Sequence, residues 1–385
     1  MSSKTELQES QTHSFTADAA STSEIIPDRE FIGEASAPHD CTPQTPTGVI
    51  IEYLLREAPQ FRRLSKLRKR GWDNPEGDRF FKEQRQNADR PDKKTAKWFY
   101  KMMKEIGYDM QRHTGVFQLQ GSSPDNYSVL DMCMAPGGFL ATAVRINPEA
   151  RALGFSLPDW DGGHGVLLPE HPNVTLKLLD ITMLAEDMGL TDDIPSDHPD
   201  ATNFLPRQFT PDQTFDLVIC DGQVLRTHER AAYREKKEAS RLTLTQLALG
   251  LEHVKPGGTM VVLLHKVEAL HTVRLLHTFS KFASVQLYKH AKIHAKRSSF
   301  YMIATNIRAG CEDAIMAIEG WKDRWKIATF GTDEMYHDAL FGECPDVEAL
   351  LEEFGPRMVQ LGKNVWNIQA NALAKAPFVR EMAVY

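Results

Sequence analysis

Short apolar runs alternate with amphipathic helical patterns through the middle of the chain. The runs have the length of strands and turn residues nearby, and they cover residues 127–132, 152–156, 174–179, 215–220, 259–264, 284–287 and 300–305. Apolar residues at helical spacing lie between several of them, over 139–146, 231–253 and 269–282. This alternation predicts an α/β fold with a mainly parallel sheet between helices. The last two runs have no strong helical pattern between them, which predicts an antiparallel edge.

The segments on either side of this pattern differ from it. Residues 1–47 are rich in Ser, Thr, Pro and acidic residues, which predicts a disordered leader. Apolar residues recur at helical spacing over 48–120, which predicts an N-terminal helical region. The α/β pattern occupies 121–310 and contains a Pro- and Asp-rich surface loop at 187–214. Helical patterns return over 314–325 and 347–354, and we interpret 311–385 as a C-terminal helical extension.

Composition narrows the cellular setting. The chain has 385 residues, of which 42% are hydrophobic and 25% charged, as in an ordinary globular protein. No apolar run approaches the roughly 18 residues of a membrane span, and the polar N-terminal segment lacks the features of a secretory signal. The five cysteines are scattered without close pairs, which disfavours disulfides and a zinc module. We therefore expect an intracellular protein with no membrane partner and no metal.

A glycine turn follows the first strand of the α/β pattern. Residues 130–139 read Leu-Asp-Met-Cys-Met-Ala-Pro-Gly-Gly-Phe, so a strand ends, the chain turns, and a helix begins. Ligands of open parallel sheets bind at such turns, and glycine lets the backbone approach a ligand closely. The helix N-terminus suits a carboxylate. Neither the phosphate-loop pattern nor the three-glycine dinucleotide pattern is present.

This string is similar to the first motif of the FtsJ-like RNA 2′-O-methyltransferase family. Three later segments resemble further motifs in the family's order: 173–182, 215–222 and 251–260. The resemblance covers roughly residues 93–307. It implies a Rossmann-like methyltransferase fold that binds S-adenosyl-L-methionine and methylates a ribose 2′-hydroxyl of RNA.

The resemblance also implies which residues hold the cofactor. They are Asp131, Ala135, Pro136, Gly137, Gly138 and Phe139 of the turn, Asp180 and Ile181 at the adenine end, and Asp221 beside the methyl donor. The second strand departs from the pattern, because Ser156 replaces the usual acidic residue that binds ribose. Asp159 lies just beyond it, and either side chain is able to bond a ribose hydroxyl. The Gly-rich segment 161–165 is expected to fold over the cofactor.

The family's reaction uses a Lys-Asp-Lys-Glu set, in which a lysine of lowered pKa activates the hydroxyl. Asp221 matches the Asp, at the end of an apolar strand. Lys266 is our candidate for the central lysine, with His265 as the alternative. Its offset of three residues from the family's position turns it to the other face unless a bulge intervenes.

The two outer positions of the set are less well matched. Lys101 is our candidate for the first lysine, with Lys97 and Lys94 as rivals. Ser299 stands where the family has Glu, which removes one carboxylate partner of the lysines. This substitution leaves a catalytically silent RNA- or protein-binding module as the alternative to an RNA methyltransferase. A methyltransferase for a small molecule or a protein is a third hypothesis.

Three basic stretches are candidates for contact with RNA phosphates, because Lys and Arg supply affinity that does not depend on sequence. They are residues 62–70, 226–241 and 289–297. The alternative interpretation is that each is an ordinary solvated surface, and acidic residues within 226–241 favour that view there. The net charge of −7 argues only weakly against RNA, because it can conceal local basic patches.

Overall fold

The computed structural model describes residues 45–89, 91–120, 127–190, 194–341 and 346–379. Residues 1–44 of the expected leader therefore lie outside the described part of the chain. Among the described residues, no helix is both long and apolar enough to cross a membrane.

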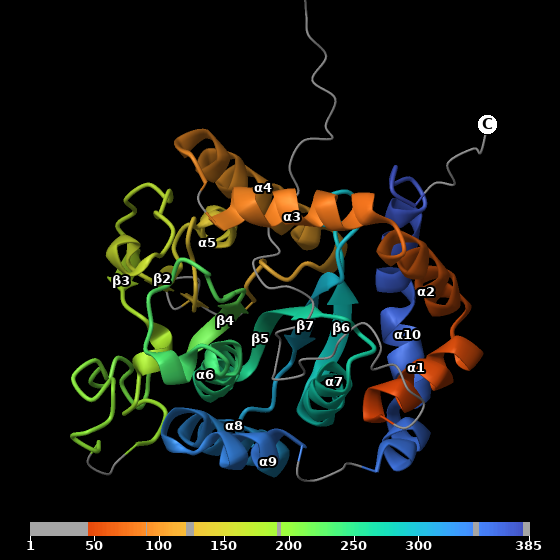
Figure 1. The fold of residues 1–385 in the computed structure, drawn as a ribbon. Helices are drawn as coiled ribbons and strands as arrows, with labels where there is room; N and C mark the ends of the chain where they lie inside the picture. The colour runs from red at the N-terminus through yellow and green to blue at the C-terminus, as the bar shows by residue number, and fades with distance from the viewer. Residues whose placement is uncertain (1–44, 90, 121–126, 191–193, 342–345, 380–385) are drawn as a thin grey trace, which may run out of the picture.

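A single seven-stranded sheet lies at the centre of the molecule (Figure 1), in the order β3-β2-β1-β4-β5-β7-β6. The strands are β1 (Ser128–Asp131), β2 (Arg151–Ser156), β3 (Val174–Leu178), β4 (Phe215–Cys220), β5 (Val254–His265), β6 (Ser284–Tyr288) and β7 (Ser299–Thr305). Only β7 is antiparallel to its neighbours, β5 and β6. The prediction of a mainly parallel sheet with an antiparallel edge is confirmed, with the antiparallel strand one place in from β6.

Both faces of the sheet are buried at β1, β4 and β7, which explains why these strands appear in the sequence as continuous apolar runs, whereas the edge strand β3 is partly exposed. On β4, Leu217 and Ile219 belong to one hydrophobic cluster and Val218 to the other. The first cluster includes residues of α4 (Lys93–Thr114) and α5 (Gly138–Ile146). The second includes residues of α6 (Glu238–Glu252), α7 (Leu270–Phe282) and α8 (Glu312–Phe330).

The helices of the two chain ends pack together beside β6 (Figure 1). They are α1 (Pro46–Glu57), α2 (Pro59–Trp72) and α10 (Val347–Leu373), while α3 (Pro75–Asp89) contacts α2 and α9 (Asp333–Phe341) contacts α8. Phe61 of α2 meets Trp366 of α10 edge to face, with 5.4 Å between ring centroids. Both rings belong to the same hydrophobic cluster as α6 and α7.

Two helical boundaries differ from the sequence pattern. The helix expected over 231–253 begins only at Glu238, because Ala232–Arg234 form a short 3-10 turn, η4, that turns Arg234 inward. The helix expected to end near 354 continues to Leu373 through Pro356. The loop predicted at 187–214 contains no helix or strand among its described residues.

Candidate functional site

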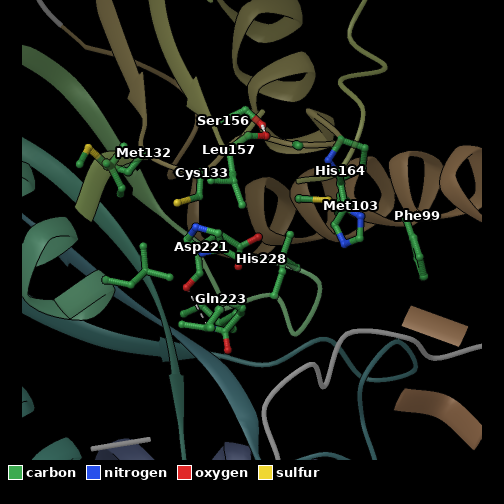
Figure 2. A pocket seen from close by; sticks show the side chains of 18 of the residues that line it. Phe99, Met103, Met132, Cys133, Ser156, Leu157, His164, Asp221, Gln223 and His228 are labelled. Carbon is green, nitrogen blue, oxygen red and sulfur yellow. Dashed lines mark hydrogen bonds between the residues drawn. The ribbon is translucent and has the colours of Figure 1, made fainter. Parts of the chain in front are cut away.

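A pocket of about 170 Å³ opens where β1, β2 and β4 end, at their carboxyl edge. Its apolar wall comes from α4, through Phe99, Met102, Met103 and Ile106. Its polar lining residues are Ser156, His164, Asp180, Thr182, Asp221, Gln223, His228, Glu238, His294 and Tyr301. Figure 2 shows Asp221 and Gln223 on one side of the pocket and Ser156, Leu157 and His164 on the other.

The glycine turn contributes to the pocket through Ala135 and Pro136. Gly137 is left-handed, with φ of 101°, and Gly138 opens α5. A Cβ on Gly138 would collide with Met103 and lie 2.8 Å from the carbonyl oxygen of Tyr100. Gly138 therefore lets α4 pack closely, and its missing side chain makes room for protein rather than for a ligand.

The other two expected turn residues lie behind the pocket. Asp131 is 2% exposed and accepts a hydrogen bond from the backbone nitrogen of Cys133 at 3.3 Å. Phe139 is buried in the core, where its ring meets Tyr301 edge to face. Of the six expected turn residues, Ala135 and Pro136 line the pocket, while the other four support the residues that do.

The second strand brings Ser156 to the pocket and leaves Asp159 outside it. Ser156 is buried and lines the cavity, whereas Asp159 is exposed in the short 3-10 turn η2 (Asp159–Asp161). The Gly-rich segment that follows contacts the chain after β4, since the Thr227 hydroxyl donates to the Gly162 carbonyl at 2.8 Å. His164 of this segment lines the pocket. The loop therefore borders the site.

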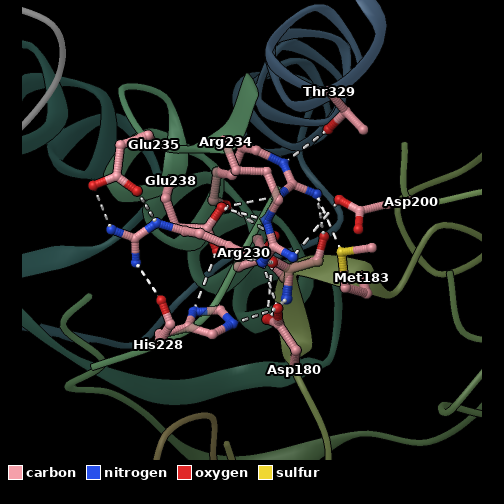
Figure 3. Close-up of polar contacts among 12 residues, drawn as sticks. Asp180, Met183, Asp200, His228, Arg230, Arg234, Glu235, Glu238 and Thr329 are labelled. Atoms are coloured by element: carbon pink, nitrogen blue, oxygen red, sulfur yellow. Dashed lines mark hydrogen bonds and ion pairs between the residues drawn. The ribbon is translucent and has the colours of Figure 1, made fainter. Parts of the chain in front are cut away.

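Asp180 lies in a network of buried charges (Figure 3). The Arg234 guanidinium bonds the carboxylates of Asp180 and Glu238, at 2.5 and 2.6 Å. Although burial opposes it, the charges of Arg234 and His228 hold the pKa of Asp180 below its ordinary value. Asp180, His228 and Glu238 offer ligand atoms within 4.8 Å of one another, as a metal would need. The guanidinium of Arg234 already supplies a positive charge to both carboxylates.

Asp221 directly follows β4 and combines burial with an incomplete set of partners. Burial, and then the nearby charge of Asp131, raise its pKa well above the ordinary range, and a hydrogen bond from Tyr301 opposes this. Its Oδ1 atom is buried and has no hydrogen-bond partner among the described residues. Burial also raises the pKa of Asp131 to about 7. Among the described residues, no cation lowers the pKa of either carboxyl group.

The structure does not bring the predicted lysines to this pocket. Lys266 comes directly after β5, with φ of 45°, and is not a lining residue. The pairing of β5 with β7 is continuous from Met260 to His265, so no bulge turns Lys266 toward the cavity. Leu263 lines the pocket instead, opposite Tyr301 of β7.

The candidate for the first lysine, Lys101, also lies outside the pocket. Lys101 is exposed on α4, while the next two residues of that helix line the pocket. The rivals Lys97 and Lys94 are also exposed. No lysine is among the described residues that line the cavity, which corrects the expected grouping of Lys101 and Lys266 with Asp221.

Sequence reasoning missed several lining residues on the β5–β7 side. Leu263 and Tyr301 are paired across β5 and β7, and strand alternation alone does not say which face borders a ligand. His294 lies in the irregular segment between β6 and β7, where no periodicity gives its direction. His265, the alternative to Lys266, bonds Gln223 at 3.3 Å but is not a lining residue.

The three basic stretches differ in how far their cations are exposed to solvent. In 226–241, Arg234 and Arg241 are buried in ion pairs with Glu238. In 289–297, Lys289 and Arg297 are buried as well. Of these three stretches, the one on α2 presents a row of exposed cations. A groove there is lined by Pro59, Arg62, Arg63, Lys66, Leu67, Arg70 and Ala374.

Solved structures with a related fold are distant from this chain. An rRNA methylase from Streptococcus thermophilus has 11% identity and a TM-score of 0.28, over 55% of this chain and 95% of its own. The fibrillarin/Nop5p complex has 12% identity and a TM-score of 0.30, over 48% of this chain and 75% of its own. TrmN from Thermus thermophilus has 11% identity and a TM-score of 0.31, over 52% of this chain and 48% of its own. These scores are too low to carry an argument about activity, and no curated protein sequence matches at a significant level.

The match to a family model is more specific. The model described as FtsJ-like methyltransferase matches residues 108–307, just over half of the chain. The matched segment includes the glycine turn, the pocket's strands and Asp221. The protein therefore belongs to the FtsJ-like methyltransferase family.

Proposed function

We propose that this protein is an S-adenosylmethionine-dependent methyltransferase that acts on a ribose 2′-hydroxyl of RNA. The observation that carries the proposal is Asp221, a buried carboxyl group in the family's motif with one oxygen unpartnered at the pocket. Burial of a carboxylate without a partner is costly. A cationic ligand offsets that cost, and a sulfonium is such a cation.

The pocket residues fit this cofactor in charge and polarity. When bound, S-adenosylmethionine supplies an electrophilic methyl group on its sulfonium. The α4 wall lines the pocket with apolar side chains, and the Ser156 hydroxyl, also a lining group, would bond the ribose hydroxyls. Ala135 and Pro136, which line the pocket, would border the amino-acid part, and Asp180 with Ile181 would border the adenine end. Asp131, Gly137, Gly138 and Phe139 act indirectly by holding the turn.

The proposed RNA substrate is supported by the groove on α2. Arg62, Lys66 and Arg70 follow one another every four residues and so share one side of the helix. They extend over about 12 Å at the helical rise per residue. Arg68 of the same helix pairs with Glu268, which lies just after Lys266 at the carboxyl end of β5. Through this ion pair, α2 contacts the segment after β5, at the edge of the sheet where the pocket also lies.

Cofactor binding and methyl transfer test the proposal separately. Calorimetry with S-adenosylmethionine is expected to show binding to the wild type. Labelled methyl transfer to total RNA, followed by nuclease digestion, is expected to place the label in 2′-O-methylnucleosides. Asp221→Ala should abolish the transfer, and Asp159→Ala, which changes an exposed carboxylate outside the pocket, should not. Label in the bases or in protein would refute the ribose assignment.

One observation favours a second candidate, a catalytically silent module that binds RNA or protein. Leu263 borders the pocket, and no lysine does so among the described residues. Ser299 also replaces the family's Glu. This candidate predicts RNA binding without methyl transfer, and Asp221→Ala would then leave RNA affinity unchanged. Transfer that depends on Asp221 would exclude it.

A further inference from the structure

We propose that Tyr301 is a positioning residue whose phenol hydroxyl holds the Asp221 carboxylate ready for the cationic methyl donor, an inference that rests on the proposed function. Tyr301 lies in β7 and lines the same pocket as Asp221. Its hydroxyl donates a hydrogen bond to the Asp221 carboxyl group. The Oδ1 atom of Asp221 has no hydrogen-bond partner among the described residues. One donor of the protein therefore holds this carboxyl group, and an oxygen is left for a ligand.

The ring of Tyr301 is fixed by its neighbours in the core. Tyr301 is 8% exposed, and its ring meets that of Phe139 edge to face, with 5.6 Å between the centroids. Phe139 lies in the first turn of α5, directly after the glycine turn. In the sheet, Tyr301 pairs with Leu263 of β5 and with Tyr288 of β6. The donor is therefore in place before a ligand binds, and a donor placed in advance needs no reorganisation on binding.

The hydroxyl of Tyr301 also acts on the charge of Asp221. Burial, and then the charge of Asp131, raise the pKa of Asp221 well above its ordinary value, and the hydrogen bond from Tyr301 opposes them. A hydrogen bond donated to a carboxylate favours the ionised form. Burial raises the pKa of Tyr301 well above its own ordinary value, so the phenol keeps its proton and stays a donor. Tyr301 therefore favours the negative charge that pairs with a sulfonium.

The other titratable groups beside Asp221 or along the pocket are neutral or paired. Burial raises the pKa of the thiols and lowers that of the imidazoles, in the group Cys133, Cys220, His228 and His294. Asp180 and Glu238 are paired with Arg234. His164 lies across the pocket from Asp221 (Figure 2). The charge of Asp221 thus depends mainly on burial, Asp131 and Tyr301.

Tyr288 offers a matched comparison for Tyr301. Its hydroxyl donates to the Asp109 carboxylate at 2.6 Å, and it is the residue of β6 that pairs with Tyr301. Neither Tyr288 nor Asp109 lines the pocket. Phenylalanine at either position removes a phenol hydroxyl that donates to a carboxylate and keeps the aromatic ring. A difference between the two variants therefore reports on the pocket rather than on the loss of a buried hydrogen bond.

The test is the pH dependence of S-adenosylmethionine affinity, measured by calorimetry for wild type, Tyr301→Phe and Tyr288→Phe. A hydrogen bond to a charged group is worth about one pKa unit, so Tyr301→Phe should move the midpoint up by about one pH unit. Its affinity should be about tenfold below wild type under both midpoints and within about twofold above them. Tyr288→Phe should follow the wild-type profile. Adenosine, which has no sulfonium, should bind all three proteins equally.

A second measurement needs no ligand. In protein labelled with ¹³C at the aspartate carboxyl carbons, the Asp221 resonance is identified by its loss in Asp221→Asn. It should titrate at higher pH in Tyr301→Phe than in wild type. An unchanged titration, or a loss of affinity that is the same at every pH, would overturn the role of Tyr301 and leave the proposed function intact. Failure of the wild type to bind S-adenosylmethionine would overturn the proposed function and this role with it.

Discussion

Asp131 ends β1 and Asp221 directly follows the neighbouring strand β4; Asp131 is 2% exposed, and the Oδ1 atom of Asp221 is buried. Burial raises both pKa values, and the charge of Asp131 raises the pKa of Asp221 further. Cationic ligands favour the ionised form of such a pair. The acidity of the empty pocket and its affinity for a cation are therefore linked.

We expect S-adenosylmethionine affinity to increase with pH. Asp221 has a raised pKa in the free protein, so binding of a sulfonium at low pH must first release its proton. The association constant should rise by up to about tenfold per pH unit below that pKa and level off above it. Calorimetry between pH 5.5 and 8.5, in buffers of different ionisation enthalpy, measures both the affinity and the proton release.

Asp221→Asn is the matched variant for this prediction. Its uncharged amide should weaken binding and remove the pH dependence, because nothing remains to titrate beside the sulfonium. Adenosine, which has no sulfonium, serves as the control ligand and should bind equally well across the range. An affinity of S-adenosylmethionine that is flat with pH in the wild type would contradict the proposed pairing with Asp221.

Asp131→Asn should stabilise the protein at high pH. The folded pKa of Asp131 is about 7, above the ordinary 3.8, so stability is highest when the group is protonated and falls as pH rises between these values. At about 1.4 kcal/mol per pKa unit, the penalty above pH 7 is at most about 4 kcal/mol. Urea unfolding should show Asp131→Asn more stable than wild type at pH 8 and equal to it at pH 4.

Asp159→Asn is the control for the urea unfolding experiment. Asp159 is exposed, so this variant should be as stable as wild type at both pH 8 and pH 4. Asparagine at 131 keeps an oxygen that accepts from the Cys133 nitrogen, so the turn loses no hydrogen bond. Equal stability of Asp131→Asn and wild type at pH 8 would contradict the prediction, because it would show that the ionised Asp131 carboxylate costs the folded protein no stability.

The sequence placed some site residues where the structure has them and misplaced others, for one physical reason. Ser156 ends β2, Asp221 directly follows β4 and Ala135 lies in the turn after β1, and the ends of parallel strands meet at one edge of the sheet. Lys266 and Lys101 required a register and a helix face to be known. A shift of one residue in either reverses the direction of a side chain, and the glycine turn gives no information about that register.

Among the elements, the close packing of α4 on the glycine turn sets the apolar wall of the pocket. Gly138→Ala is expected to destabilise the protein by about 1–3 kcal/mol, because the added Cβ collides with Met103. Helix propensity alone predicts the opposite sign, since alanine favours a helix over glycine. Gly310→Ala is the matched control, because nothing lies within 4 Å of its added Cβ. A lower urea midpoint for Gly138→Ala than for wild type would show that the collision outweighs helix propensity, and a higher midpoint would show the reverse.

The α2 groove gives a prediction about RNA affinity. Replacing Arg63, Lys66 and Arg70 together by Gln should weaken binding of a uridine oligonucleotide in fluorescence anisotropy. If each cation meets one phosphate of a single strand, the slope of log affinity against log salt should fall by about 2. Arg62 is left in place, because its guanidinium bonds the backbone carbonyls of Leu55 and Arg56 between α1 and α2, whereas that of Arg63 bonds the exposed side chain of Asn371.

A second triple variant controls for net charge. Lys236, Lys281 and Lys363 are exposed cations outside the groove, and their replacement by Gln removes the same charge. It should leave the salt slope unchanged. Equal losses in both triple variants would show that RNA responds to overall charge and that the groove is not a specific contact surface.

Sequence patterns located the strands better than the helix ends. Strands buried on both faces are short apolar runs between turns, and that signal is local. The start of α6 depends on Arg234 reaching Asp180, which is a contact between distant parts of the chain. The length of α10 depends on its packing against α2, which sustains the helix past Pro356. Such boundaries are set by tertiary contacts rather than by propensity.

At the scale of the molecule, helices from both chain ends complete one hydrophobic cluster with the sheet. Trp366 of α10 and Phe61 of α2 belong to it together with Val262 of β5. Polar contacts follow the same path, since Arg63 donates to Asn371 at 2.6 Å and Arg68 to Gln369 at 2.8 Å. Separations of about 300 residues in the sequence give no local pattern, which is why the sequence presented these regions as flanking attachments.

We therefore expect that the family segment does not fold by itself. A fragment of residues 93–307 keeps α4 and all seven strands but exposes the apolar surfaces that α1, α8 and α10 bury. It should unfold without a cooperative transition, whereas residues 46–379 should unfold in one step. Trp366→Ala in the full chain should cost about 3–5 kcal/mol, because its ring is 1% exposed. A fragment 93–307 whose Tm lies within about 5 °C of the full chain would show that the terminal helices are independent of the core.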